Sequence, residues 1–173
     1  MKQNTRIIIG VAIVVLVAAV VLVVDNVQRQ AEAERLNAQA IQFQITALPP
    51  GSIPIYVGER IVAGFTPDDL ASLTEASFVD AEEGKTQQGW LLRDILSLYL
   101  PAEQLQPDTQ VTVISTSREK QVNITWKEIE DEANMVMFDV SGRGTLKLVS
   151  KLEYLDVRDE WVQDVDRIEV TPQ

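Results

Sequence analysis

Lys85 stands in the short motif Gly84-Lys85-Thr86, which matches the end of a phosphate-binding loop. Such a loop cradles phosphate with backbone amides and needs a second glycine five residues before Gly84. Val79 occupies that position, and Asp80 follows it. The required glycine is missing and carboxylates would face the phosphates, so the sequence argues against a nucleotide site and predicts an ordinary polar loop.

Carboxylates are the most abundant side chains with catalytic potential. An EF-hand needs a central glycine and a glutamate at its twelfth position, and neither spacing occurs. Paired carboxylates also serve as acid and base in glycoside hydrolysis, but 26 acidic residues bring some pairs together by chance. No catalytic and no metal-binding residue is assigned, and solvated acidic faces are predicted instead. These faces comprise Asp156, Asp159, Glu160, Asp164 and Asp166, together with Glu128, Glu130, Asp131 and Glu132.

Arg143 lies in the segment Ser141-Gly142-Arg143-Gly144, which has two interpretations. Its backbone amides and its guanidinium group suit an anion. Two glycines between alternating apolar runs are also what a hairpin turn requires, and the turn is the favoured interpretation.

Composition excludes several classes of chemistry. The 173 residues contain no cysteine and no histidine, which removes disulfides, thiolate nucleophiles, iron–sulfur clusters and histidine-dependent triads. With 15 basic and 26 acidic side chains, the net charge is −11. An acidic surface repels phosphate, so nucleic acid and anionic lipid headgroups are not expected as partners.

An uncharged apolar run from Ile7 to Val24 follows the N-terminal residues 1–6. Its 18 residues are enough to span a bilayer core as a helix. Lys2 and Arg6 precede it, so the N-terminus is expected in the cytoplasm and the rest of the chain outside the cell membrane. A cleaved signal peptide is the alternative, with cleavage near Ala33, but the apolar run is long for one and a signal anchor is favoured.

Residues 25–40 are rich in Ala, Gln, Glu and Arg and are expected to form a helical stalk. Strict alternation over residues 41–46 predicts a strand, so one extracytoplasmic domain is expected over residues 41–173. Residues 110–126 and 135–150 predict two hairpins around a short helix, and the last strand is expected to carry a bulge near Asp164. The predicted fold class is α+β, with mixed or antiparallel sheet in one domain.

One helix is predicted between Gly89 and Pro101. Leu92, Ile95, Leu96 and Tyr99 fall at i, i+3, i+4 and i+7, which places them on one apolar face. Gly89 is expected to cap this helix and Pro101 to stop it.

The order of several short motifs in the C-terminal two thirds of the chain is distinctive. A "TPDDL" helix, a glycine before "WLLRDIL", a strand "VTVIST", the segment "MVMFDVSGRGTLKLVS" and a closing "VDRIEV" follow one another. Over residues 41–170 this order resembles the sulfite-oxidase-type molybdopterin-binding domain family. The resemblance implies that family's fold.

In catalytic members of that family a pterin dithiolene and one protein cysteine bind molybdenum. The resemblance places the cysteine in the segment Ser77 to Glu83, which contains none, although a soft thiolate is what suits that metal. It therefore implies a pseudoenzyme without a metal site. The pocket that would remain for a small-molecule ligand lies near the loop Ser115 to Lys120, and its expected residues are Gly89, Trp90, Arg118 and Lys120.

Two functions follow as expectations. The first is a non-catalytic binding or accessory module that needs no cofactor, is held in the lipid bilayer by Ile7 to Val24, and docks on another membrane protein. The alternative is an oxidoreductase that binds molybdopterin without a cysteine ligand. A carboxylate-based hydrolase has no supporting motif.

Overall fold

The computed structural model describes residues 48–173, which belong to one compact unit, Ala47–Gln173. The predicted membrane helix over residues 7–24, the stalk over residues 25–40 and the strand over residues 41–46 lie outside the described residues. Within residues 48–173 no helix is both long and apolar enough to cross a membrane.

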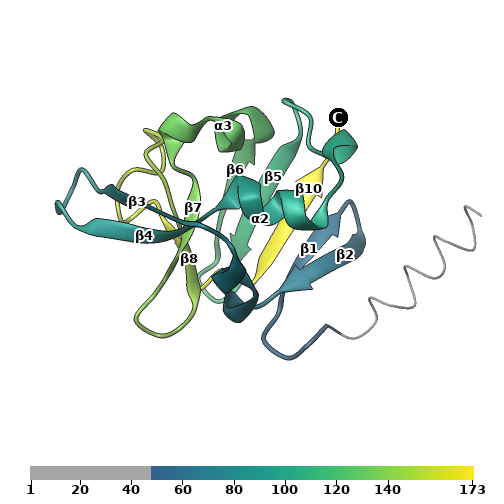
Figure 1. Cartoon of the computed structure of the whole chain (residues 1–173), viewed down its shortest axis with the longest axis horizontal. Coiled ribbons are helices and arrows are strands. Elements are labelled where there is room, and N and C mark those ends of the chain that lie inside the picture. The colour runs from purple at the N-terminus through teal and green to yellow at the C-terminus, as the bar shows by residue number, and fades with distance from the viewer. Residues whose placement is uncertain (1–47) are drawn as a thin grey trace, which may run out of the picture. The chain divides into compact units, whose positions relative to one another are not determined.

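The predicted fold class is wrong. Residues 48–173 form ten strands in two five-stranded sheets, with two short α-helices, α2 (Leu92–Tyr99) and α3 (Trp126–Glu130), so the fold is mostly β rather than α+β. Three 3-10 turns complete the elements: η1 (Pro67–Ser72), η2 (Ala102–Gln104) and η3 (Glu132–Asn134). Helices of eight and five residues are too short to form a layer of their own, and they pack against the sheets instead (Figure 1).

The first sheet joins the two ends of the described chain. Its order is β2-β1-β10-β5-β6, in which β1 runs parallel to β10 and the other neighbours are antiparallel. Gly58, at a φ of 61°, provides the tight turn between β1 and β2. The strands are β1 (Ile53–Val57), β2 (Arg60–Phe65), β5 (Gln110–Ser115), β6 (Lys120–Thr125) and β10 (Arg167–Thr171).

The second sheet is antiparallel throughout and has the order β3-β4-β7-β8-β9. The hairpin of β3 and β4 extends away from the body of the domain in Figure 1. Its strands are β3 (Glu75–Val79), β4 (Thr86–Leu91), β7 (Met137–Val140), β8 (Leu146–Val149) and β9 (Val162–Gln163). Both hairpins predicted from alternation, β5 with β6 and β7 with β8, are confirmed.

The larger of two hydrophobic clusters lies between the sheets and α2, and a smaller one comprises Met137, Val149 and Trp161. Leu92, Ile95 and Leu96 are fully buried in the larger cluster and Tyr99 packs at its margin, which confirms the predicted apolar face of the helix. Tyr99 stacks on Phe65, with ring centroids 5.9 Å apart. In Figure 1, α2 lies in front of the sheets and covers that side of the core.

Gly89 does not cap α2, contrary to the prediction. It lies inside β4, opposite Asp139 of β7. A methyl group at this position would lie 1.8 Å from the carbonyl oxygen of Phe138, so only glycine allows β7 to approach so closely. Gly89 therefore fixes the pairing of two strands rather than a helix end.

The expected single last strand is divided at Asp164. Its first part, β9, pairs with β8 in the second sheet, and its second part, β10, pairs with β1 and β5 in the first sheet. Asp164 adopts a φ of 55°, and the chain changes sheets there. The break in alternation that predicted a bulge thus marks a crossing between sheets.

Candidate functional site

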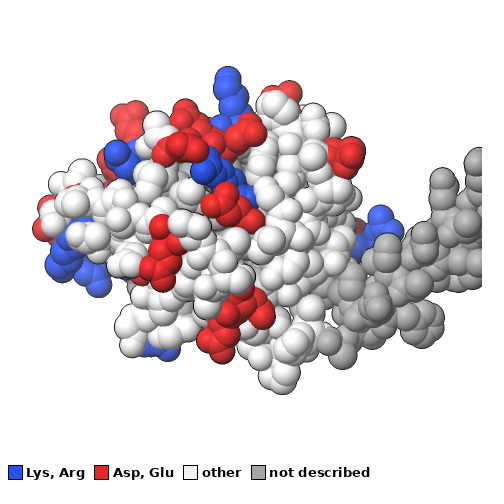
Figure 2. Space-filling view, in the orientation of Figure 1, with Lys and Arg blue, Asp and Glu red and all other residues white. Residues whose placement is uncertain are grey.

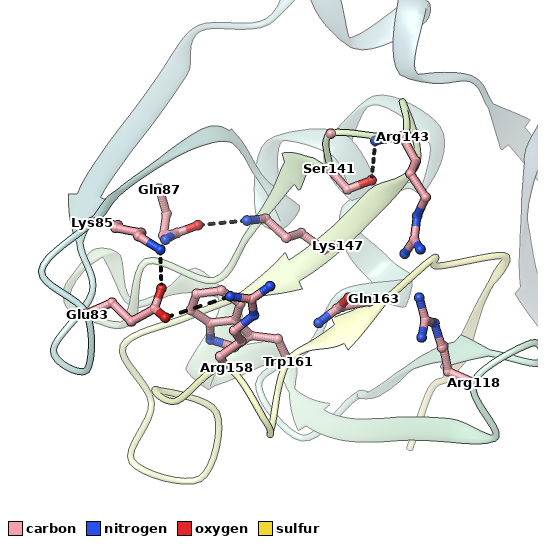
Figure 3. Close-up of a pocket in the computed structure, with 11 residues that line it drawn as sticks. Glu83, Lys85, Gln87, Arg118, Ser141, Arg143, Lys147, Arg158, Trp161 and Gln163 are labelled. Atoms are coloured by element: carbon pink, nitrogen blue, oxygen red, sulfur yellow. Dashed lines mark hydrogen bonds and ion pairs between the residues drawn. The ribbon is translucent and has the colours of Figure 1, made fainter.

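One cleft among residues 48–173 is lined by an unusual concentration of basic side chains, and we call it the cationic cleft. Its volume is about 430 Å³, within the range of small-molecule pockets. It is assembled from turns of both sheets and from one face of the second sheet (Figure 3). Its lining residues are Glu83, Lys85, Gln87, Arg118, Ser141, Gly142, Arg143, Lys147, Arg158, Trp161 and Gln163.

The floor of the cleft is the outer face of the second sheet. In β8, Leu146 and Leu148 are buried in the core, so Lys147 between them points to the opposite face. The strand register places Asp139 of β7 and Gln163 of β9 on either side of Lys147. Strand alternation therefore brings a row of polar groups onto this face.

Lys147 is held by three neighbours. Its Nζ donates to Oε1 of Gln87 at 2.8 Å and pairs with Oδ2 of Asp139 at 3.1 Å. It also lies over the indole ring of Trp161, 5.1 Å from the centroid. The ammonium group is thus fixed at the floor, with only 19% of its side chain exposed.

Asp80 organises the turn between β3 and β4. Its carboxylate is buried and accepts hydrogen bonds from the amide of Glu83 at 2.6 Å, the amide of Lys85 at 3.2 Å and Nε2 of Gln87 at 2.8 Å. These bonds, above all that from the Glu83 amide, hold the pKa of Asp80 below its usual value. Asp80 thereby orients Gln87 toward Lys147.

Asp164 holds two arginines on the other side of the cleft, and we call this group the Asp164 clasp. Nε of Arg118 donates to it at 2.7 Å, and Nη2 of Arg143 donates at 2.9 and 3.1 Å. Oγ1 of Thr145 donates at 2.7 Å and is the largest cause that lowers the pKa of Asp164, followed by Arg118. Figure 3 shows the two guanidinium groups on the same side of the cleft, near Gln163.

The mouth of the cleft carries two more cations around Glu83. Nζ of Lys85 lies 2.7 Å from its carboxylate and Nη1 of Arg158 lies 3.7 Å away (Figure 3). The hydrogen bond from Lys85 lowers the pKa of Glu83. Both cationic side chains are more than half exposed, so they are free to turn toward a ligand.

The charge of the cleft is opposite to that of the domain. Residues 48–173 contain 11 basic and 23 acidic side chains, a net charge of −12, and acidic groups predominate on the face drawn in Figure 2. Five of the 11 basic side chains nevertheless line this one cleft. Three carboxylates pair with them, namely Glu83, Asp139 and Asp164, which leaves two net positive charges. The site is therefore suited to an anion.

The structure separates the four pocket residues expected from the sequence. Arg118 lines the cleft, and Lys120 lines a pocket beside it. Gly89 and Trp90 lie in β4 and do not line the cleft; Trp90 is buried in the core.

Several residues that line the cationic cleft are not predicted by the sequence. Lys147 and Gln163 are single polar residues in short strands, and only the register of β8 and β9 brings them together. For Arg143 the two interpretations, a hairpin turn and an anion site, are compatible, because this residue lies in the turn between β7 and β8 and also lines the cleft. The predicted solvated face is wrong for Asp164, whose side chain is 18% exposed and bound to two arginines.

The residues present do not fit a molybdenum site. The chain contains no thiolate, and within residues 48–173 no three acidic or histidine side chains gather as a metal site requires. Asp80 lies where the resemblance expects the metal-binding loop, and its carboxylate oxygens are already occupied by three hydrogen bonds from the protein. No step of the proposed function therefore involves that metal.

No protein-family model matches the sequence, and no curated protein matches it. The resemblance to sulfite-oxidase-type domains stays a prediction.

Proposed function

We propose that this chain is an extracytoplasmic, membrane-anchored binding module whose cationic cleft holds a small anionic ligand. The observation that carries the proposal is the placement of five of 11 basic side chains around one cleft in a domain of net charge −12. A cluster of one sign inside a surface of the other sign concentrates the field at that point and attracts an anion to it.

The ionisation states of the two carboxylates Glu83 and Asp164 favour binding over catalysis. A general acid at neutral pH needs a carboxyl group whose pKa is raised. The pKa values of Glu83 and Asp164 are instead lowered by their hydrogen-bond donors, so both stay ionised near neutral pH. Their role is to hold cationic side chains in place, and the module is accordingly proposed to be non-catalytic.

The anchor is proposed from the sequence. The run from Ile7 to Val24 would hold the module at the outer face of the membrane, where another membrane protein is its proposed partner. Protease added outside intact cells or spheroplasts is expected to digest the domain. A domain that survives this treatment in uncleaved protein would show that the orientation is reversed.

Anion binding is tested on the full-length chain in a non-ionic detergent. Calorimetric titration with inorganic phosphate at low ionic strength is expected to show binding that weakens as salt is added. Arg143→Gln removes one exposed cation of the cleft, and an exposed ion pair is worth about 0.2–1 kcal/mol, so binding is expected to weaken by a factor of about 1.4 to 5. Trp161 lines the cleft, whereas Trp90 and Trp126 do not, so a change in tryptophan fluorescence provides a second readout.

The matched control is Lys127→Gln. Lys127 is exposed on α3 and does not line the cleft, so its removal changes the net charge by the same amount. Equal losses of phosphate affinity in both variants would mean that the overall charge, and not the cleft, attracts the anion. If neither phosphate nor a larger phosphate anion binds the folded wild-type chain, the proposal is overturned.

A further inference from the structure

A second pocket continues the cationic cleft toward the turn between β5 and β6. Its volume is about 210 Å³. It shares four lining residues with the cleft, so the two pockets are lobes of one groove rather than separate sites. The shared residues are Arg118, Arg158, Trp161 and Gln163, and the second lobe adds Lys120 and Asp159.

Each lobe has its own cations, and two arginines serve both. Lys85, Arg143 and Lys147 line only the first lobe, and Lys120 lines only the second. The shared Arg118 and Arg158 have side chains that are 43% and 57% exposed, so a bound group can reach both guanidinium groups while Arg118 stays paired with Asp164 and Arg158 with Glu83. One anionic group in either lobe therefore meets cations of that lobe and the shared guanidinium groups.

Trp161 lines both lobes of the groove and is buried. Trp161 is 6% exposed, and its indole Nε1 has no hydrogen-bond partner among the described residues. Lys120 is also held in place, because its Nζ donates a hydrogen bond to the backbone carbonyl oxygen of Asp159. Trp161 and Lys120 are thus fixed parts of the groove, and the arginines that line it are held by single carboxylates, Asp164 and Glu83.

We infer that the ligand carries at least two covalently linked phosphate groups, one in each lobe, as in a diphosphate or a short oligophosphate. The inference rests on the proposed anion-binding function and names the ligand class. Guanidinium forks bind phosphate oxygens in pairs, and three arginines line the groove. Linking two anionic groups makes the second contact intramolecular, so the affinity rises beyond that of either group alone.

The test compares inorganic phosphate, pyrophosphate and tripolyphosphate on the full-length chain, in metal-free buffer at constant ionic strength. Tripolyphosphate is expected to bind with a stoichiometry of one and at least about tenfold more tightly than phosphate. Lys120→Gln tests the second lobe. It is expected to weaken tripolyphosphate binding about fivefold and phosphate binding less than about twofold, because phosphate alone occupies the more cationic first lobe. Lys127→Gln is the control for charge and should leave the ratio of the two affinities unchanged.

Each outcome decides between the two proposals. Phosphate binding without a gain for tripolyphosphate, or equal effects of Lys120→Gln on both anions, would overturn the two-lobe ligand and leave the anion-binding function intact. Failure of all three anions to bind the folded chain would overturn the anion-binding function itself.

Discussion

The Asp164 clasp determines how much of the cationic charge is available to a ligand. Asp164 occupies the guanidinium groups of Arg118 and Arg143, so a bound anion competes with its carboxylate. Asp164→Asn removes that charge with little change in shape. Asparagine tolerates the left-handed conformation that this position requires, at a φ of 55°, and its amide oxygen still accepts from Thr145.

The expected gain in anion affinity follows from the charge removed. Two unit charges about 4 Å apart interact by about 1 kcal/mol in water and by about 4 kcal/mol at an effective dielectric constant of about 20. The cleft is open and the Arg143 side chain is 60% exposed, so the lower figure applies. A loss of about 1 kcal/mol of repulsion corresponds to roughly fivefold tighter phosphate binding. The gain should shrink at high salt because screening weakens it.

Calorimetry with phosphate on the full-length chain measures this effect, with Asp68→Asn as the matched control. Asp68 is exposed on η1 and lies outside the cleft, so it tests whether any lost carboxylate raises the affinity. If Asp164→Asn binds phosphate more weakly than wild type at an unchanged melting temperature, the competition argument is refuted. Asp164 would then act by aiming the two arginines at the ligand.

Two further predictions concern stability. Gly89→Ala is expected to cost at least about 3 kcal/mol, or roughly 10 °C in melting temperature, because its methyl group would meet only backbone atoms, at 1.8 to 2.9 Å. Gly142→Ala, which meets nothing within 4 Å, should be nearly neutral in the same denaturation experiment, and equal losses would disprove the steric argument. The pKa of Asp80 is lowered in the folded state, so its contribution is complete above an ordinary aspartate pKa of about 3.9 and is lost as the pH falls through the lowered value. The melting temperatures of wild type and Asp80→Asn should therefore differ at pH 7 and converge in acid, and a gap that persists at low pH would contradict the assignment.

Local sequence patterns predicted those parts of the fold that local interactions determine. The face of α2 repeats every three to four residues, and the hairpins of β5 with β6 and of β7 with β8 alternate every two, so their periods identify them. The first half of β4 falls in the predicted polar loop and its second half at the start of the predicted helix, because one face of the strand is the floor of the cleft and carries Gln87, while Gly89 contributes no side chain to the pattern. Polar residues on a buried strand face thus remove the alternation that would have identified the strand.

The division into two sheets was beyond the reach of local patterns. Strand β9 has two residues, and its partner β8 lies more than a dozen positions away in the sequence. The turn at Asp164 that sends the next strand to the other sheet is visible in the sequence only as broken alternation. A bulge and a crossing break alternation in the same way, so the sequence alone does not distinguish them.

The net charge of the chain and the charge of the cleft lead to different expectations, and both bear on the size of the ligand. The acidic excess, averaged over the surface, predicts repulsion of phosphate. The cations of the cleft come from turns and strands between residues 83 and 163, and the fold brings them together in one place. The short oligophosphate that we propose would contact those cations. A long polyanion such as nucleic acid would extend past the groove onto a surface where 23 acidic side chains outnumber 11 basic ones, and each added phosphate would meet repulsion. Under the proposed function, the acidic surface would therefore limit the length of the ligand, while the cleft would select a negative charge.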